Sequence, residues 1–271
     1  MGGLLEDITK KVSPEKRLIF ASVSAFLSVF LFGAYIYKLD IPLIDSLFYF
    51  TPLGILFTVF ALVGLSNAYN IIDGFNGLAS GVAIVVFTSF VYMVFIKDDS
   101  FLLSVSLVML FAILGFFVLN FPFGKIFLGD GGAYFIGFVI GFLSDYLVFK
   151  HRDVSPWYPL VLSVYPVFET VFSIYRRKLS RKYRPLEPDA LHLHTLIYRR
   201  LTLRLGLKND VFRNSAVMPL LVIPYLPFVV IANLFWDKTA VLAGLSAVYM
   251  VIYLFIYRSI VRFKVKAWAR R

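Results

Sequence analysis

The chain has 271 residues, of which 60% are hydrophobic, and it carries a formal net charge of +11. Soluble domains are only about 45–50% apolar, so this composition excludes an ordinary water-soluble protein. Cysteine is absent, which excludes disulfides and thiolate metal sites. In a membrane protein, a basic balance is typical of loops that face anionic lipid and phosphorylated ligands, so we expect no nucleic-acid partner.

Apolar runs that approach the roughly 20 residues needed to cross a bilayer recur along the chain. The sequence therefore predicts an all-α fold, a polytopic helical bundle that forms a single domain over residues 1–271. About eight spans are expected, at 18–37, 48–66, 78–96, 101–119, 133–149, 156–175, 215–236 and 239–257. Three polar segments interrupt this pattern, at 67–81, 120–132 and 176–214.

The distribution of charge orients the bundle. If residues 1–17 are cytoplasmic and the chain alternates sides, all but five of the 27 lysines and arginines fall on the cytoplasmic side. The exceptions are Lys38, Lys97, Lys150, Arg152 and Lys238. Because inside loops are enriched in these residues, we expect a multi-pass protein of a bacterial inner membrane with both termini in the cytoplasm. All three polar segments then lie on the cytoplasmic face.

The segment 67–81, NAYNIIDGFNGLASG, is a polar stretch between two long apolar runs. It carries Asn67, Asn70 and Asn76, one carboxylate at Asp73, and glycines that allow tight turns near a ligand. An ionisable group at the edge of a hydrocarbon layer is a functional candidate, because leaving it unsatisfied there is costly. The alternative is a plain inter-helix loop in which the asparagines act as caps.

The same face gathers acids and cations in the pattern of a phosphoryl-transfer site. Its acids include Glu6, Asp7, Asp73 and Asp130, and the basic segment contributes His192 and His194. Hard oxygen ligands without cysteine suit Mg²⁺ or Mn²⁺, which bind through one or two carboxylates plus substrate phosphates. Arginine and histidine suit the phosphates themselves. The alternatives are first-turn helix acids for the acidic pair, a turn residue for Asp130 and solvated loop histidines.

Five motifs also resemble one known family, the polyprenyl-phosphate N-acetylhexosamine-1-phosphate transferases. Residues 67–78, NAYNIIDGFNGL, resemble the family's N-x-x-N-x-x-D-G-x-D-G-L signature, and residues 127–132, FLGDGG, resemble its F-M-G-D-x-G-S motif. Residues 3–7, GLLED, resemble the G-x-x-D-D element. Residues 166–170, PVFET, resemble the P-x-[FL]-[DE]-T helix, and residues 189–195, DALHLHT, resemble the H-x-H-H loop. The motifs follow the family's order over most of the chain.

The resemblance implies that a UDP-sugar and polyprenyl phosphate react, with Mg²⁺, to give a polyprenyl-diphosphate-sugar and UMP. By resemblance, Asp130 is the metal ligand, supported by Asp73, and Asp7 with Glu6 activates or holds the lipid phosphate. Phe127 would stack on the uracil, and His192 and His194 would grip the diphosphate or sugar. Asn67, Asn70, Asn76 and Asn120 complete the nucleotide-binding set. A homodimer is possible.

The chain departs from the family pattern at Glu6, Asn76 and Thr195, which replace two aspartates and a histidine. It also begins at the acidic pair, where the family has two or three earlier helices. The alternative function is therefore an inactive or fragmentary relative that binds nucleotide-sugar or lipid phosphate. A transporter is disfavoured, because its polar groups would lie near the midplane. Three residue questions stay open: Phe127 as core, Glu169 as a partner of Arg176 or Arg177, and the role of Asp145.

Overall fold

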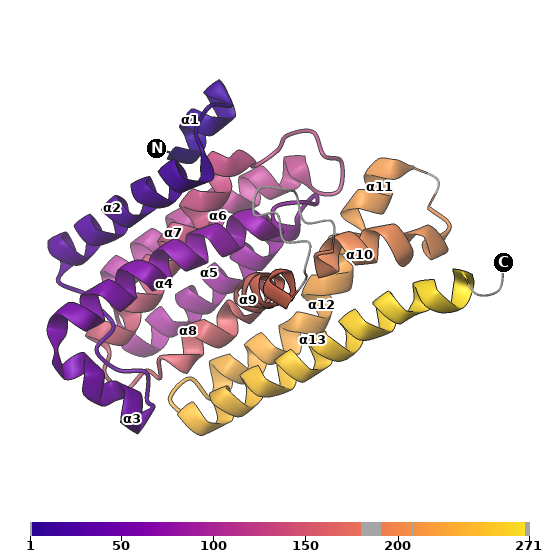
Figure 1. Cartoon of the computed structure of the whole chain (residues 1–271). Coiled ribbons are helices and arrows are strands. Elements are labelled where there is room, and N and C mark those ends of the chain that lie inside the picture. The colour runs from indigo at the N-terminus through magenta and orange to yellow at the C-terminus, as the bar shows by residue number, and fades with distance from the viewer. Residues whose placement is uncertain (1, 180–190, 208, 269–271) are drawn as a thin grey trace.

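The structure is a computed structural model that describes residues 2–179, 191–207 and 209–268. These residues form helices and connecting loops, with no strand among them (Figure 1). The long helices are α2 (Pro14–Phe32), α4 (Thr51–Ile72), α5 (Leu78–Lys97), α6 (Ser100–Asn120), α7 (Gly129–Lys150), α9 (Val164–Leu179), α12 (Val217–Leu234) and α13 (Thr239–Trp268). The short ones are α1 (Gly2–Thr9), α3 (Pro42–Asp45), η1 (Ser46–Tyr49), α8 (Trp157–Leu162), α10 (Leu193–Arg200), η2 (Thr202–Leu205) and α11 (Asp210–Ser215). The all-α prediction is confirmed.

Six helical runs in the described part of the chain are long and apolar enough to cross a membrane. They are α4, α5, α6, α7, the run of α11 and α12, and α13 up to Val261. Six of the eight predicted spans fall on them, and the chain is a polytopic helical membrane protein. Outward-facing side chains such as Phe111 on α6 and Phe255 on α13 are 66% and 72% exposed, as expected for surfaces that face lipid.

The first predicted span was too long. Helix α2 ends at Phe32 because Gly33 adopts a left-handed backbone with φ of 65°, a common helix terminator. The residues that follow are extended and lie against α4, where the Ile36 amide donates to the hydroxyl of Thr58 at 2.7 Å. A Cβ on Gly54 would meet the Ile36 carbonyl oxygen at 2.7 Å, so this glycine admits the extended segment.

The predicted span at 156–175 is two helices. Helix α8 stops at Leu162 and α9 starts at Val164, with Ser163 between them. Pro166 has no N–H, so a continuous helix would leave the Leu162 carbonyl without its intrahelical partner. The hydroxyl of Tyr225, on α12, donates to that carbonyl instead. The break is therefore satisfied by a buried side chain.

The bundle is built around α5, the most enclosed of the six long apolar helices, while α6 and α13 are among the least enclosed. Helices α4 and α7 approach closely, since a Cβ on Gly137 would lie 2.8 Å from the Leu65 carbonyl oxygen. Such small residues are typical of helix contacts in membranes. The turn from α12 to α13 lies at one end of the bundle, whereas α1, α10 and α11 lie at the other (Figure 1).

The end that holds the α12–α13 turn is closed by ion pairs between its loops. Lys97 pairs with Asp153, and Asp99 pairs with Lys150 at 2.9 Å. His151 also contacts Asp99 at 2.9 Å. These contacts join the 97–99 loop to the 150–155 loop, so lysines that were predicted to lie outside gather at one end.

Candidate active site

The polar segment after the second span begins inside a helix. Helix α4 continues to Ile72, so Asn67 and Asn70 lie in its last two turns and not in a loop. Their side chains face α7: Asn70 donates to the Asp130 carboxylate at 2.9 Å, and Asn67 accepts from the Tyr134 hydroxyl at 3.2 Å. The prediction of loop caps is wrong for these two residues, because partners on α7 hold them as helix side chains.

The true turn covers residues 73–77 and is fixed by the predicted Asn120. Gly77 adopts a left-handed backbone with φ of 76°, and its amide donates to the Asn120 side-chain oxygen at 2.6 Å. The Asn120 amide group in turn donates to the Ile126 carbonyl at 2.7 Å. Asn120 is buried and joins the 73–77 turn to the 120–128 loop. Asn120 therefore stabilises the two loops that form this part of the site.

Asp7 caps the N-terminus of α7. Its two carboxylate oxygens accept from the backbone amides of Asp130, at 2.9 Å, and Gly131, at 2.8 Å. The first amides of a helix have no intrahelical partner, and the helix dipole favours an anion there. Asp7 and Asp130 therefore belong to one hydrogen-bonded unit, which ties α1 to the start of α7.

Asp130 itself lies in the first turn of α7 and is held from two sides. Arg17, at the start of α2, forms an ion pair with one carboxylate oxygen, and Asn70 donates to the other. Glu6 does not share this arrangement: its carboxylate accepts from the Val12 amide at 2.7 Å, within the loop that follows α1. Of the acidic pair, Asp7 therefore lies at the site, whereas Glu6 stabilises the loop after α1.

Asp73 lies at the C-terminal end of α4, close to the other two acids. Burial raises the pKa of Asp73 to about 7, and the carboxylates of Asp130 and Asp7 add to the increase by repulsion. The ionised form of Asp73 is therefore disfavoured at this site, in part by the neighbouring carboxylates. A bound cation would relieve that repulsion.

A second feature at this end is an open cleft of about 270 Å³. Its lining combines aromatic rings, amides and one acid: Asn76, Phe123, Gly124, Phe127, Tyr198, Asp210, Val211 and Asn214. Phe127 is 80% exposed, which excludes the alternative that it is a core residue. Asn76 is buried and donates its backbone N–H to the Asn214 side-chain oxygen at 2.8 Å, so the 73–77 turn forms one wall.

The two histidines are not the solvated loop residues of the alternative: His194 lies next to the 73–77 turn, and His192 stacks on His194. His192 precedes α10 and His194 lies within it. Both side chains are buried, and their rings stack at 5.1 Å with an angle of 11°. A Cβ on Gly74 would lie 3.7 Å from the His194 Nε2 atom. Asp189, at the start of the same motif, lies outside the described residues.

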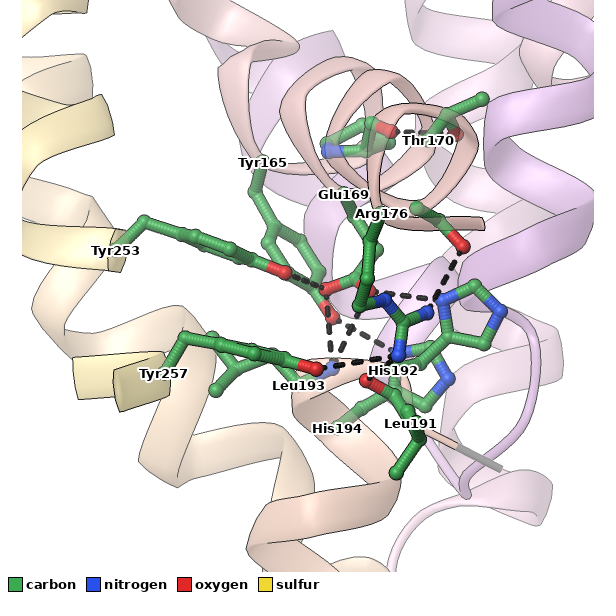
Figure 2. Close-up of polar contacts among 12 residues, drawn as sticks. Tyr165, Glu169, Thr170, Arg176, Leu191, His192, Leu193, His194, Tyr253 and Tyr257 are labelled. Atoms are coloured by element: carbon green, nitrogen blue, oxygen red, sulfur yellow. Dashed lines mark hydrogen bonds and ion pairs between the residues drawn. The ribbon is translucent and has the colours of Figure 1, made fainter. Parts of the chain in front are cut away.

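The sequence left the partners of Glu169 open, and the structure identifies them. The buried carboxylate of Glu169 contacts His192 Nδ1 at 2.8 Å and accepts from the Tyr253 hydroxyl at 2.7 Å (Figure 2). Nothing in the sequence predicted Tyr253, because it lies in an apolar span. No role was predicted for Arg17. Asp145 is buried in α7, and nothing in the structure explains it.

The predicted metal ligands supply only part of a coordination shell. Among the described residues, no three histidine, aspartate or glutamate side chains converge as a metal-binding group. Asp73 and Asp130 are nonetheless hard oxygen donors, and a magnesium site commonly needs just one or two carboxylates when substrate phosphates complete it. The donor chemistry and the repulsion of Asp73 by two neighbouring carboxylates fit a divalent cation.

Fold and site together define a polytopic helical membrane protein with a carboxylate cluster at one end of its bundle. Residues 1–147 match the family described as Glycosyl transferase family 4. This match covers more than half of the chain, and the chain belongs to that family.

Curated relatives match the chain in part. A probable undecaprenyl-phosphate N-acetylglucosaminyl 1-phosphate transferase of Bacillus subtilis is 35% identical over 169 residues, covering 59% of the chain and 47% of the relative. The undecaprenyl-phosphate alpha-N-acetylglucosaminyl 1-phosphate transferase of Escherichia coli K12 is 33% identical, covering 55% and 41%. A phospho-N-acetylmuramoyl-pentapeptide-transferase of Lactobacillus gasseri is 34% identical, covering 43% and 34%. The matches thus span less than half the length of these relatives.

Proposed function

We propose that this protein transfers a sugar-1-phosphate, an N-acetylhexosamine-1-phosphate, from a UDP-sugar to polyprenyl phosphate. An acceptor phosphate oxygen forms a bond to the sugar-bearing phosphorus of the donor. The bond from that phosphorus to the bridging oxygen breaks, and UMP leaves with the oxygen. The names of the matched relatives support this reaction class, and the protein would act at the cytoplasmic face of a bacterial inner membrane.

The observation that carries the proposal is the meeting of Asp7, Asp73 and Asp130 with Arg17 at the junction of α1, α4 and α7. Phosphoryl transfer depends mostly on positioning and charge neutralisation. Arg17, which now pairs with Asp130, is placed to turn toward a phosphate when a cation takes up that carboxylate. Asp7 would hold the start of α7, and with it Asp130, in a fixed position.

Mg²⁺, or Mn²⁺ in its place, fits this donor set, and Asp130 and Asp73 are the residues that would hold it. When bound, it would neutralise the donor diphosphate. The cleft beside the 73–77 turn suits a nucleoside, since Phe127 offers an exposed ring and Asn76 lines the adjacent wall. His194 lies beside Gly74 of this turn, where the sugar or diphosphate would extend.

The test uses the intact protein, purified in detergent, with UDP-N-acetylglucosamine and undecaprenyl phosphate. UMP release should require both substrates and Mg²⁺, and should fall by about 10²-fold or more in Asp130→Asn, as expected when a principal charge-stabilising group is lost. Asp98→Asn is the matched control, because Asp98 is exposed at the opposite end and its left-handed backbone tolerates asparagine. Release of UMP without acceptor lipid, or full activity in Asp130→Asn, would contradict the proposal.

One observation favours a second candidate, a relative that binds nucleotide-sugar without turning it over. Both oxygens of Asp7 accept from backbone amides, and Asp130 is already paired with Arg17. The same assay separates the candidates: Mg²⁺-dependent binding of the donor with no UMP release would support the binding protein.

A further inference from the structure

The cluster around Glu169 joins three segments that are far apart in the sequence. Glu169 comes from α9, His192 from the start of α10 and Tyr253 from the C-terminal helix α13 (Figure 2). The Glu169 carboxylate is 1% exposed and also accepts from the Leu193 amide, at 3.2 and 3.3 Å. A buried carboxylate is expensive unless hydrogen bonds satisfy it, so these donors are necessary partners.

The hydrogen bond from Tyr253 is held in place by packing. The Tyr253 ring packs edge-on against Phe168 and Phe172, with ring centroids 4.9 Å and 5.6 Å apart. Helix α9 therefore fixes the position of the ring whose hydroxyl donates to Glu169. One turn later, the Tyr257 hydroxyl accepts from Arg176 at 3.1 Å, and Arg176 also donates to the Leu191 carbonyl at 3.1 Å. Helix α13 thus contacts both α9 and the residues just before α10.

The carboxylate controls the orientation of a ring that stacks on His194. A partner on one ring nitrogen of a histidine fixes the ring and directs the other nitrogen away from that partner. Glu169 contacts His192 Nδ1, and the His192 ring stacks on His194. His194 is held separately by the Tyr165 hydroxyl at 3.2 Å and lies beside Gly74, the neighbour of Asp73.

We propose that Glu169 and Tyr253 are positioning residues for the transfer reaction: they fix the His192 ring and, through the stack, hold His194 beside the turn that carries Asp73. The inference rests on the proposed function, because it assigns these residues to the same site. It gives α13, which the family match over residues 1–147 does not include, a part in that site.

The first measurement reads the ring without requiring turnover. The chain has three histidines, so diethyl pyrocarbonate modification can be followed at each by peptide mass. Tyr253→Phe and Glu169→Gln should increase the modification rate of His192 severalfold, while His151, at the opposite end, serves as an internal reference. The matched control is Tyr249→Phe, which removes a buried hydroxyl one turn earlier on α13, where the ring packs on Tyr225 and Phe228. An unchanged His192 rate in both variants would overturn the proposal.

The second measurement is a double-mutant cycle on transfer and on donor binding. Tyr253→Phe should lower kcat/KM about tenfold, the fold-change expected for one hydrogen bond to a charged group. In a His192→Gln background, the same substitution should change either readout by less than about twofold, because its effect passes through His192. Equal effects in both backgrounds would mean a merely structural role and overturn the proposal.

The two measurements distinguish a failure of the proposed function from a failure of the positioning role. If the wild-type protein releases no UMP, the proposed function fails, while His192 reactivity and donor binding still decide the positioning role. If transfer is normal and Tyr253→Phe changes neither His192 reactivity nor transfer, the positioning role alone fails. Glu169→Asp, which keeps the charge on a shorter arm, should recover part of the activity lost in Glu169→Gln.

Discussion

Asp7 shows how a residue can be found in the sequence while its geometry stays hidden. The family resemblance implied that Asp7 acts on the acceptor phosphate. In the structure, both oxygens of Asp7 accept from the first amides of α7, next to Asp130. The bonds that set this role run between residues more than 120 positions apart, so no local pattern could indicate them.

Asp7→Asn is therefore expected to weaken donor binding as well as transfer. An asparagine amide would place N–H groups against one of the two α7 amides, and losing such a cap costs about 0.5–2 kcal/mol. Asp130, whose own amide is one of the donors, would shift with the helix start. Mg²⁺-dependent binding of UDP-sugar, measured in detergent, should fall severalfold, with Asp98→Asn as control. Full donor binding in Asp7→Asn would instead show that Asp130 binds the donor independently of Asp7.

Asp73 gives the site a dependence on pH. Its pKa is about 7 in the folded protein, against about 3.9 for an unperturbed aspartate, so folding favours the protonated form. This contribution to stability is complete below pH 4 and is lost as the pH rises to 7. At pH 8 without divalent ions, Asp73→Asn should raise Tm by about 2–4 °C, the shift that 1 kcal/mol produces in a chain of this size.

Mg²⁺ is expected to reverse the effect of Asp73→Asn on Tm, because the ionised carboxylate of Asp73 is the proposed metal ligand. At pH 8, Mg²⁺ should raise the Tm of the wild-type protein more than that of Asp73→Asn, and the wild-type gain should shrink at pH 6. Melting curves with and without Mg²⁺, at both pH values, check this. A wild-type gain that does not vary with pH would remove Asp73 from the metal site.

At the scale of elements, apolar runs located the helices well and their ends poorly. The extension of α4 to Ile72 could not be predicted from the sequence, because an asparagine side chain competes for backbone hydrogen bonds and disfavours a helix unless it has another partner. Here the partners of Asn70 and Asn67 are side chains on α7. The break at Ser163 depends on Tyr225, a partner from another helix. Boundaries of this kind are set by tertiary contacts.

The docking of α1 on α7 depends on glycine at one position that the sequence motif contains. A Cβ on Gly3 would lie 2.8 Å from the backbone carbon and oxygen of Asp130, which cannot move aside like a side chain. Gly3→Ala should therefore displace α1, cost about 1–3 kcal/mol and strongly reduce transfer. Gly64→Ala, in open space on α4, is the matched control: it should leave transfer unchanged and should not lower the melting temperature, because alanine favours a helix more than glycine does. Melting temperature and UMP release measure the two effects.

For the whole molecule, the two ends differ in chemistry. One end is closed by ion pairs among the 97–99 and 150–155 loops, and the other carries the carboxylates, the cleft and the histidines. The sequence predicted this separation because lysine and arginine report the side of the membrane. Which end faces the cytoplasm follows from that rule alone, so it remains a prediction.

The absence of native cysteine makes that prediction directly testable with single-cysteine variants. Ser100→Cys lies at the ion-paired end and Lys125→Cys at the site end, and both positions are exposed. A membrane-impermeant maleimide should label Ser100→Cys in intact cells, and should label Lys125→Cys only after permeabilisation. The proposed donor is a charged nucleotide-sugar of the cytoplasm, so the proposed function requires the site to face that side. Labelling of Lys125→Cys in intact cells would place the acids and cleft outside, and the proposed function would fail with it.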